Sequence, residues 1–146
     1  MKVKQLSLFL ENKPGALSHP IKLLAKAGFN LLTLSLADTQ QFGILRLVVR
    51  DWQKAKKRLE SAGFVVKVTD LVALEVADEP GGLARVLACL EKAGVNVEYM
   101  YGFTLKHEGK GLLAFRFDDP DQAIAALQRK GMKPVSSAEL FKRLED

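Results

Sequence analysis

The chain has 146 residues, of which 48% are hydrophobic, and its 22 lysines and arginines against 17 aspartates and glutamates give a formal net charge of +5. This length suits one ordinary domain or two small ones, and no segment reaches the roughly 18 consecutive apolar residues of a membrane-spanning helix. The single cysteine, Cys89, excludes an internal disulfide and a zinc site built from several cysteines. We therefore expect a soluble, cytoplasmic protein without a cofactor.

The sequence contains an internal repeat. A shift of 66 residues superimposes the Pro-Gly-x-Leu segment at residues 14–17 on residues 80–83. The Ala-Gly-x-Asn segments that follow, which end at Asn30 and Asn96, match at the same shift. Later in each repeat the shift becomes 68, because two residues are added to a loop around residues 107–110. Such self-similarity indicates two copies of one supersecondary unit.

The first repeat opens with a strand, in which the leucines of residues 6–10 occupy every second position. A helix follows. It must begin near Gly15 or later, because Pro20 has no amide hydrogen and fits only within about the first four helical positions. Gly28 lies where a helix C-terminal glycine is expected, and Gly94 lies at the matching place in the second repeat.

The remaining elements give each repeat the order strand, helix, strand, strand, helix, strand. In the first repeat we expect strands at 30–37, 44–50 and 64–68, and a second helix that ends at about residue 62. In the second repeat we expect a strand at 72–76, a helix through residues 83–90, strands at 96–105 and 112–118, a helix at 120–130 and a weak strand at 132–135. A short terminal helix is expected within residues 136–146.

This order predicts an α+β protein made of two tandem ferredoxin-like βαββαβ domains with antiparallel sheets, at residues 1–69 and 70–135, followed by a helical tail at 136–146. Both helices of each domain should cover one face of its sheet and leave the other face open. Open faces and exposed edge strands favour side-by-side pairing of the two repeats and of two chains.

The Pro-Gly segments supply the first candidate site, because each brings a turn to the start of a helix. The first amides of a helix lack an internal acceptor and carry the positive end of the helix dipole, so residues 15–17 or 81–83 can bind a carboxylate. Asn30 and Asn96 offer donors and acceptors suited to a zwitterion. A simple turn explains the Pro-Gly pairs equally well, and a turn at the helix exit explains the asparagines.

The pattern of a strand, (Asn/Asp)-x-Pro-Gly-x-Leu and a helix ending in Ala-Gly-x-Asn resembles the ACT domain family, twice, over residues 3–135. The resemblance implies a regulatory protein that binds a free amino acid between ACT units and forms a homodimer. With no enzyme domain in this sequence, it implies action in trans on a biosynthetic enzyme. The ligand contacts that it implies are Asn12, Gly15, Ala16, Leu17 and Asn30 in the first repeat, and Asp78, Gly81, Gly82, Leu83 and Asn96 in the second.

The two repeats differ in charge at these positions. Asn12 is replaced by Asp78, and Leu32 is replaced by Glu98, so only the second repeat gains carboxylates for a ligand ammonium group. If one class of site is functional, we expect it to be the one with Asp78 and Asn96.

Other functions are weighed against these residues. His19 and His107 have no evident catalytic partner in the sequence, so we expect no enzyme and no metal site. RNA-binding domains of the same topology stack bases on aromatic residues of the central strands, but residues 43–49 contain none, and core packing accounts for Phe115 and Phe117. We expect neither nucleic acid nor a membrane as partner, and RNA binding and a pure protein–protein assembly role remain the alternatives.

Overall fold

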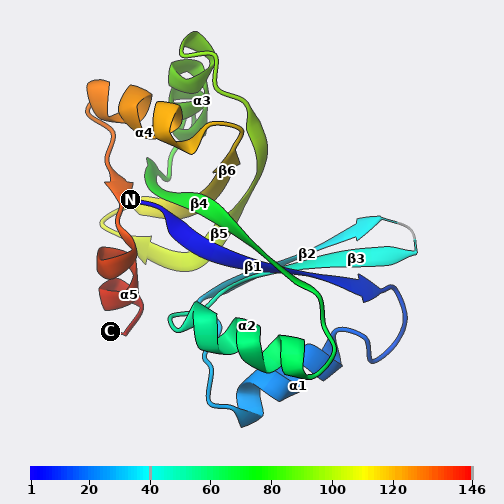
Figure 1. The fold of residues 1–146 in the computed structure, drawn as a ribbon. Helices are drawn as coiled ribbons and strands as arrows, with labels where there is room; N and C mark the ends of the chain where they lie inside the picture. The colour runs from blue at the N-terminus through cyan, green and yellow to red at the C-terminus, as the bar shows by residue number, and fades with distance from the viewer. Residues whose placement is uncertain (40, 146) are drawn as a thin grey trace. The chain divides into compact units, whose positions relative to one another are not determined.

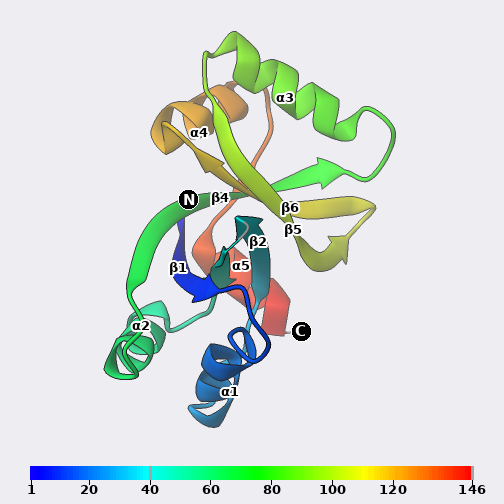
Figure 2. The same ribbon diagram turned by 90° about the vertical axis from the view of Figure 1, so that its right-hand side faces the viewer.

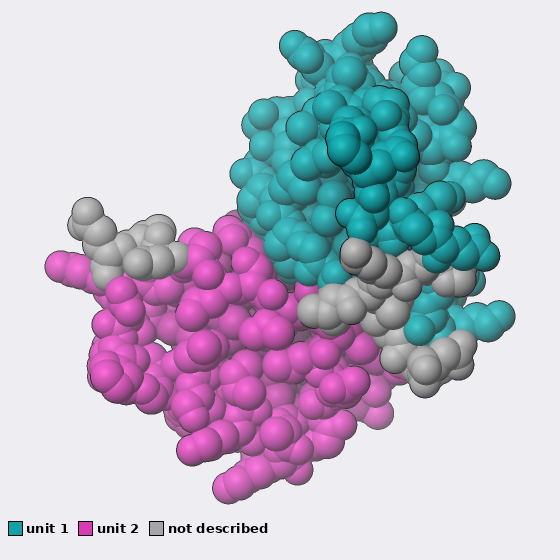
Figure 3. Space-filling model, turned by 180° about the vertical axis from the view of Figure 1, so that it is seen from behind, with its two compact units in different colours: residues 1–3, 70–146 teal, residues 4–69 magenta. Residues whose placement is uncertain are grey.

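The computed structural model describes residues 1–39 and 41–145, with the exception of the side chains of residues 38, 39, 104–107, 144 and 145. The chain divides into two compact units, which are shown in magenta and teal in Figure 3. We call residues 4–69 the N-terminal module, and residues 1–3 together with 70–146 the C-terminal module.

The N-terminal module is an antiparallel sheet with two helices on one side (Figure 1). Strand β1 lies between β3 and β4, and β2 forms the far edge next to β3. Leu45 on β3 faces Leu8 on one side and Leu36 on the other, which fixes the register of three strands. The elements are β1 (Val3–Glu11), α1 (Ser18–Lys26), β2 (Thr33–Thr39), β3 (Phe42–Val48), α2 (Trp52–Ser61) and the first residues of β4 (Val66–Ala77).

The C-terminal module repeats this arrangement. Its strands follow the order β7, β4, β6, β5, and Figure 2 shows α3 and α4 together on one side of them. The predicted α+β fold with two βαββαβ units is therefore confirmed. The elements are the rest of β4, α3 (Gly82–Lys92), β5 (Val97–His107), β6 (Lys110–Phe117), α4 (Pro120–Arg129), β7 (Pro134–Val135) and the additional helix α5 (Ser137–Glu145).

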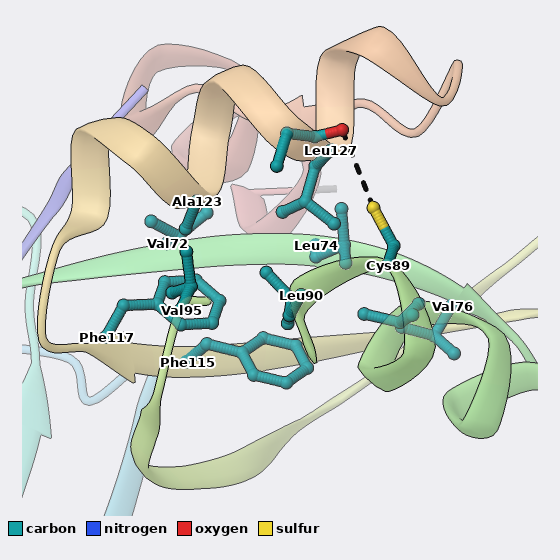
Figure 4. Close-up of a cluster of buried hydrophobic side chains, with 12 residues drawn as sticks. Val72, Leu74, Val76, Cys89, Leu90, Val95, Phe115, Phe117, Ala123 and Leu127 are labelled. Atoms are coloured by element: carbon teal, nitrogen blue, oxygen red, sulfur yellow. Dashed lines mark hydrogen bonds between the residues drawn. The ribbon is translucent and has the colours of Figure 1, made fainter. Parts of the chain in front are cut away.

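Each module has its own hydrophobic core between the sheet and its two helices. In the C-terminal module the rings of Phe115 and Phe117 stack with centroids 5.4 Å apart and are completely buried (Figure 4). Cys89 belongs to the same cluster, and its thiol donates a hydrogen bond to the carbonyl oxygen of Ala126 at 3.5 Å. Both phenylalanines therefore serve the core, as the sequence predicted, and the cysteine belongs to the same core.

The helix boundaries follow the expected signals, whereas the strand boundaries differ from the predicted ones, mostly by one to three residues. Pro20 is the third residue of α1, and Gly28 follows the helix with a φ of 83°. The two separate strands predicted at 64–68 and 72–76 are wrong: the structure has one strand, β4, because no glycine, proline or asparagine interrupts residues 66–77. Strand β3 begins at Phe42, two residues earlier than predicted.

The second face of the sheet is covered in one module and exposed in the other. Glu75 points away from the α3 and α4 core, since it alternates with core residues, and Arg143 on α5 donates a hydrogen bond to its carboxylate. Figure 1 shows α5 on the side of this sheet opposite to α3 and α4. The prediction of an open face is therefore wrong for the C-terminal module. In the N-terminal module the face is exposed at Phe9 and Phe42, which are 66% and 50% exposed, but not at Gln5, which lies on the same face and is completely buried.

Candidate functional site

Each module has a pocket beside its Pro-Gly loop, and the two pockets occupy equivalent places in the repeats. The pocket of the C-terminal module has a volume of about 440 Å³ and that of the N-terminal module about 270 Å³. The first is lined by Val76, Ala77, Asp78, Glu79, Pro80, Leu83, Gly111 and Leu113. The second is lined by Leu10, Glu11, Asn12, Lys13, Leu17, Leu36, Ala37 and Gly43.

Both Pro-Gly loops form the same turn. The amide of Ala16 donates to the carbonyl of Lys13 at 3.2 Å, and the amide of Gly82 donates to the carbonyl of Glu79 at 3.0 Å. The central glycines, Gly15 and Gly81, have φ values of 86° and 87°. Proline followed by a glycine with positive φ defines a type II turn. The turn therefore requires these glycines, and it already uses the amides of Ala16 and Gly82.

The amides that remain at the start of α3 are those of Leu83 and Ala84. The amide of Arg85 donates to the carbonyl of Gly81 at 3.1 Å, which is the first helical hydrogen bond. Within the described residues, neither Leu83 nor Ala84 donates its amide to a backbone carbonyl, as the first turn of a helix requires. Leu83 also lines the pocket, so the positive end of the α3 dipole lies at its edge.

The two helices begin at different positions in the repeat, and one glycine accounts for the difference. A Cβ atom at Gly82 would lie 2.0 Å from the carbonyl oxygen of Ala77, a distance that no side chain tolerates. The first repeat has Ala16 at the matching position, so its loop cannot approach β1 as closely. Helix α1 accordingly begins at Ser18, whereas α3 begins at Gly82, two residues earlier in the repeat.

A backbone hydrogen bond ties each loop to the neighbouring hairpin turn. The amide of Asn12 donates to the carbonyl of Gln41 at 2.9 Å, and the amide of Asp78 donates to the carbonyl of Gly109 at 3.0 Å. Both side chains are exposed at the rim of their pockets. The position shared by Asn12 and Asp78 is thus held in place by the main chain while its side chain faces solvent.

The two pockets differ in charge. In the N-terminal module Lys13 and Glu11 form an ion pair at 2.7 Å, which lowers the pKa of Glu11 and raises the pKa of Lys13. In the C-terminal module the pocket is lined by two carboxylates, Asp78 and Glu79, and Glu79 pairs with Arg85 at 2.6 Å. A ligand ammonium group therefore meets more negative charge in the C-terminal pocket.

Asn30 and Asn96 do not join these pockets within a module. The amide of Asn96 donates to the carboxylate of Asp118 at 3.0 Å, just past the end of β6, whereas Gly111 in the pocket lies at the start of the same strand. Six residues of strand separate the two ends, which corresponds to roughly 20 Å. Asn30 likewise lies three residues before β2, at the end where Thr33 pairs with Val48.

The structure thus sorts the ten predicted residues into three groups. Four line the pockets, namely Asn12, Leu17, Asp78 and Leu83; four form the adjacent turns, namely Gly15, Ala16, Gly81 and Gly82; and two, Asn30 and Asn96, lie at the opposite end of the sheet. The sequence analysis missed the wall from the third strand, with Gly43 and Gly111. The shift of 68 residues superimposes these two glycines and was the available signal.

The described part of the chain shows no other arrangement that suggests chemistry. The ring of His19 lies against that of Phe64, with centroids 5.3 Å apart, and the side chain of His107 lies outside the described residues. Among residues 1–39 and 41–145 no three histidine, cysteine, aspartate or glutamate side chains converge as a metal site would require. None of the helices described is long and apolar enough to cross a membrane.

Comparison with known proteins adds a curated relative and several solved structures. The acetolactate synthase small subunit of Buchnera aphidicola subsp. Baizongia pistaciae is 31% identical over 77 residues. This match covers 49% of the present chain and 48% of that protein, so the chain spans about half the length of the curated relative. The regulatory subunit of aspartate kinase from Thermus thermophilus, in its ligand-free form, has the same fold, with a TM-score of 0.64 and 16% sequence identity. The match covers 88% of the present chain and 93% of that subunit.

A higher similarity extends over the whole chain. The crystal structure of protein BT0572 from Bacteroides thetaiotaomicron is 39% identical, covers 97% of both chains and has a TM-score of 0.89. A family model described as an ACT domain pair matches residues 1–144. With the repeated βαββαβ modules and their equivalent Pro-Gly loops, this match identifies the chain as a member of the ACT domain pair family.

Proposed function

We propose that this ACT domain pair is a non-catalytic cytoplasmic regulator that binds a free amino acid beside its Pro-Gly loop and acts on a biosynthetic enzyme in trans. The observation that carries the proposal is the pair of equivalent pockets, each bounded by a Pro-Gly turn and the start of a helix. The names of the relatives support the regulatory part, since one is the small subunit of a synthase and another the regulatory subunit of a kinase.

The C-terminal pocket matches the two charges of an amino acid. The amides of Leu83 and Ala84 and the α3 dipole suit the α-carboxylate. The carboxylate of Asp78 suits the α-ammonium group, and an apolar ligand side chain can lie against Val76 and Leu113. The N-terminal pocket has a lysine and a glutamate that already neutralise each other, which leaves less charge for a zwitterion.

Asn96 enters the proposal through a second copy of the chain. It lies too far from Asp78 to reach the same ligand within one module, as the strand register shows. A homodimer that places the start of β5 from one chain beside the Pro-Gly loop of another chain would complete the site with this asparagine. Binding would then favour one dimer geometry over another, and this shift would be the signal to the enzyme.

A thermal-shift screen of the purified protein against the twenty amino acids tests the proposal. A ligand that binds only the folded protein, at 100 times its dissociation constant, adds about 2.7 kcal/mol to the unfolding free energy and raises Tm by several degrees. We expect one amino acid, or a small group of related ones, to raise Tm, and Asp78→Ala to abolish the response. Asn12→Ala, the same position in the first repeat, serves as the matched control and should keep it.

Asn96→Ala tests the contribution of the second copy. The side chain of Asn96 is exposed, and its main chain makes the hydrogen bonds to Asp118, so the variant should keep the Tm of the free protein. We expect it to weaken the ligand response of the dimer. A complete screen without any shift, on a protein that melts cooperatively, would contradict amino-acid binding and favour the assembly role. A response that is unchanged in Asp78→Ala but lost in Asn12→Ala would move the site to the N-terminal pocket.

A further inference from the structure

The pocket of the C-terminal module lacks a side chain that the N-terminal pocket has. Leu36 lines the N-terminal pocket, and the shift of 66 residues places Gly102 at the matching position. The strand register agrees with this match. Leu36 pairs with Leu45 on β3, and Gly102 pairs with Leu113 on β6, which is the residue that the shift of 68 matches to Leu45.

The missing side chain leaves the apolar wall of the C-terminal pocket uncovered. Leu45 is completely buried and is not among the residues that line the N-terminal pocket. Its match Leu113 is half-buried and lines the C-terminal pocket. A Cβ atom on Gly102 would lie 3.7 Å from Cδ2 of Leu113, so any side chain at this position would begin in contact with Leu113. The absence of a side chain at Gly102 therefore exposes Leu113 to a ligand.

Leu36 also narrows the N-terminal pocket beside the third strand. Its Cδ1 atom lies 3.2 Å from the place that a Cβ atom on Gly43 would take. At the matching Gly111, the nearest described atom to such a Cβ atom would be the carbonyl oxygen of Val76, at 3.9 Å. No side chain of the described residues thus takes the place of Leu36, in agreement with the larger volume of the C-terminal pocket, about 440 Å³ against about 270 Å³.

The backbone does not require glycine at position 102. Gly102 is not among the glycines with a positive φ, and 3.7 Å to Leu113 is an ordinary van der Waals distance. The register shift of β5 lies between Gly102 and Lys106, and Gly102 itself keeps its partner on β6. Glycine within a strand lowers stability and often marks a place where a ligand approaches the backbone closely. What Gly102 provides is the space beside Leu113.

We propose that Gly102 makes the C-terminal pocket selective for amino acids with an aliphatic side chain of about the size of leucine. The ligand side chain lies on Leu113, in the space that Leu36 fills in the other module. This inference rests on the proposed function, in which the start of α3 binds the α-carboxylate and Asp78 binds the α-ammonium group. Gly102 adds the third determinant, which reads the side chain.

The charges of the pocket disfavour a charged ligand side chain. Asp78 and Glu79 repel a second carboxylate. Glu79 already pairs with Arg85 at 2.6 Å, and Asp78 is used by the ligand's own ammonium group, so a cationic side chain gains little from either. The surfaces that remain beside the space are those of Val76 and Leu113, and burial of apolar atoms against them favours an aliphatic group.

Isothermal titration calorimetry with leucine and with alanine tests the proposal. The unsubstituted protein should bind leucine at least about ten times more tightly than alanine, because each additional methylene group buried in an apolar pocket strengthens binding several-fold. Gly102→Leu copies the first repeat and covers Leu113, so it should lower the affinity for leucine by about tenfold or more. Alanine does not reach this space and should bind as before. Gly102→Ala should have an intermediate affinity for leucine.

Ala125→Leu is the matched control, because it adds a leucine side chain at an exposed position of α4, outside the pocket, and it should bind leucine as the unsubstituted protein does. Gly102→Leu should keep the Tm of the free protein, since no clash opposes the new side chain. Unchanged leucine affinity in Gly102→Leu, or a preference of the unsubstituted protein for a charged or aromatic amino acid, would overturn the proposal and leave amino-acid binding intact. Binding of none of the twenty amino acids would contradict the proposed function itself, and the selectivity with it.

Discussion

Arg143 on α5 donates a hydrogen bond to the carboxylate of Glu75 near the end of β4, and Lys110 approaches the same carboxylate at 3.6 Å. The side chains of Glu75 and Arg143 are only 20% and 23% exposed. Burial acts to raise the pKa of Glu75, but the hydrogen bond and charge of Arg143, with the charge of Lys110, outweigh it and hold the pKa below its ordinary value of 4.5. The ion pair therefore fixes the position of α5 on the sheet.

Removing this ion pair should have an effect that depends on pH. Glu75→Gln should lower the unfolding free energy by roughly 1–2 kcal/mol at neutral pH, between the values for exposed and buried pairs. Because the folded-state pKa of Glu75 is lowered, its stabilising contribution is complete above the unfolded value near 4.5 and is lost as the pH falls through the folded value. Urea unfolding of both proteins across the acidic range should show the stability gap closing. A gap that stays constant down to the lowest pH would mean that Glu75 contributes by packing alone.

Gly82 should be the least replaceable glycine of the Pro-Gly loops. In Gly82→Ala the new methyl group meets the carbonyl of Ala77, so the loop and the first turn of α3 must move, at a cost of roughly 1–3 kcal/mol in unfolding free energy. The reciprocal change Ala16→Gly at the matching position should cost at most about 1 kcal/mol. Chemical denaturation measures both. Equal effects of the two substitutions would show that the early start of α3 does not depend on Gly82.

Cys89 should be unreactive in the native protein. Its thiol is buried in the α3–α4 core and donates to the carbonyl of Ala126, so a thiol reagent reaches it only when the module opens. We expect slow modification by dithiobis-nitrobenzoate in buffer and rapid modification in urea. A variant that combines Cys89→Ala with Ala88→Cys moves the thiol to the exposed neighbouring position and should react at once. Rapid reaction of native Cys89 would indicate frequent opening between α3 and α4.

The sequence predicted the fold where local chemistry decides it. Pro20 limited the start of α1, the glycines after each first helix marked its end, and the repeat supplied the order of elements. The open face of the C-terminal module was predicted wrongly, because the cover depends on Glu75 meeting Arg143, 68 residues later. A contact between residues so far apart leaves no trace in local periodicity.

The sequence predicted which loops border the site, but not which backbone amides and side chains are available to a ligand. The Pro-Gly-x-Leu segments pointed to helix starts with unpaired amides, and the pockets lie beside them. Which amides remain available depends on the type II turn, which uses those of Ala16 and Gly82. The separation of Asn96 from Asp78 depends on strand register, which places residues at opposite ends of a sheet even when each lies next to the same helix.

Residues 1–3 belong to the C-terminal module, where Lys2 pairs with Asp121 at 2.9 Å and Val3 is completely buried. During synthesis these residues are made well before Asp121. Domains usually fold in the order in which they are translated. Here the C-terminal module cannot fold completely without residues 1–3, which are synthesised before the N-terminal module. Residues 1–3 thus reach their final positions only after residues 70–146 have been made, and a bulky group placed directly ahead of Val3 would disturb the C-terminal module rather than the N-terminal one.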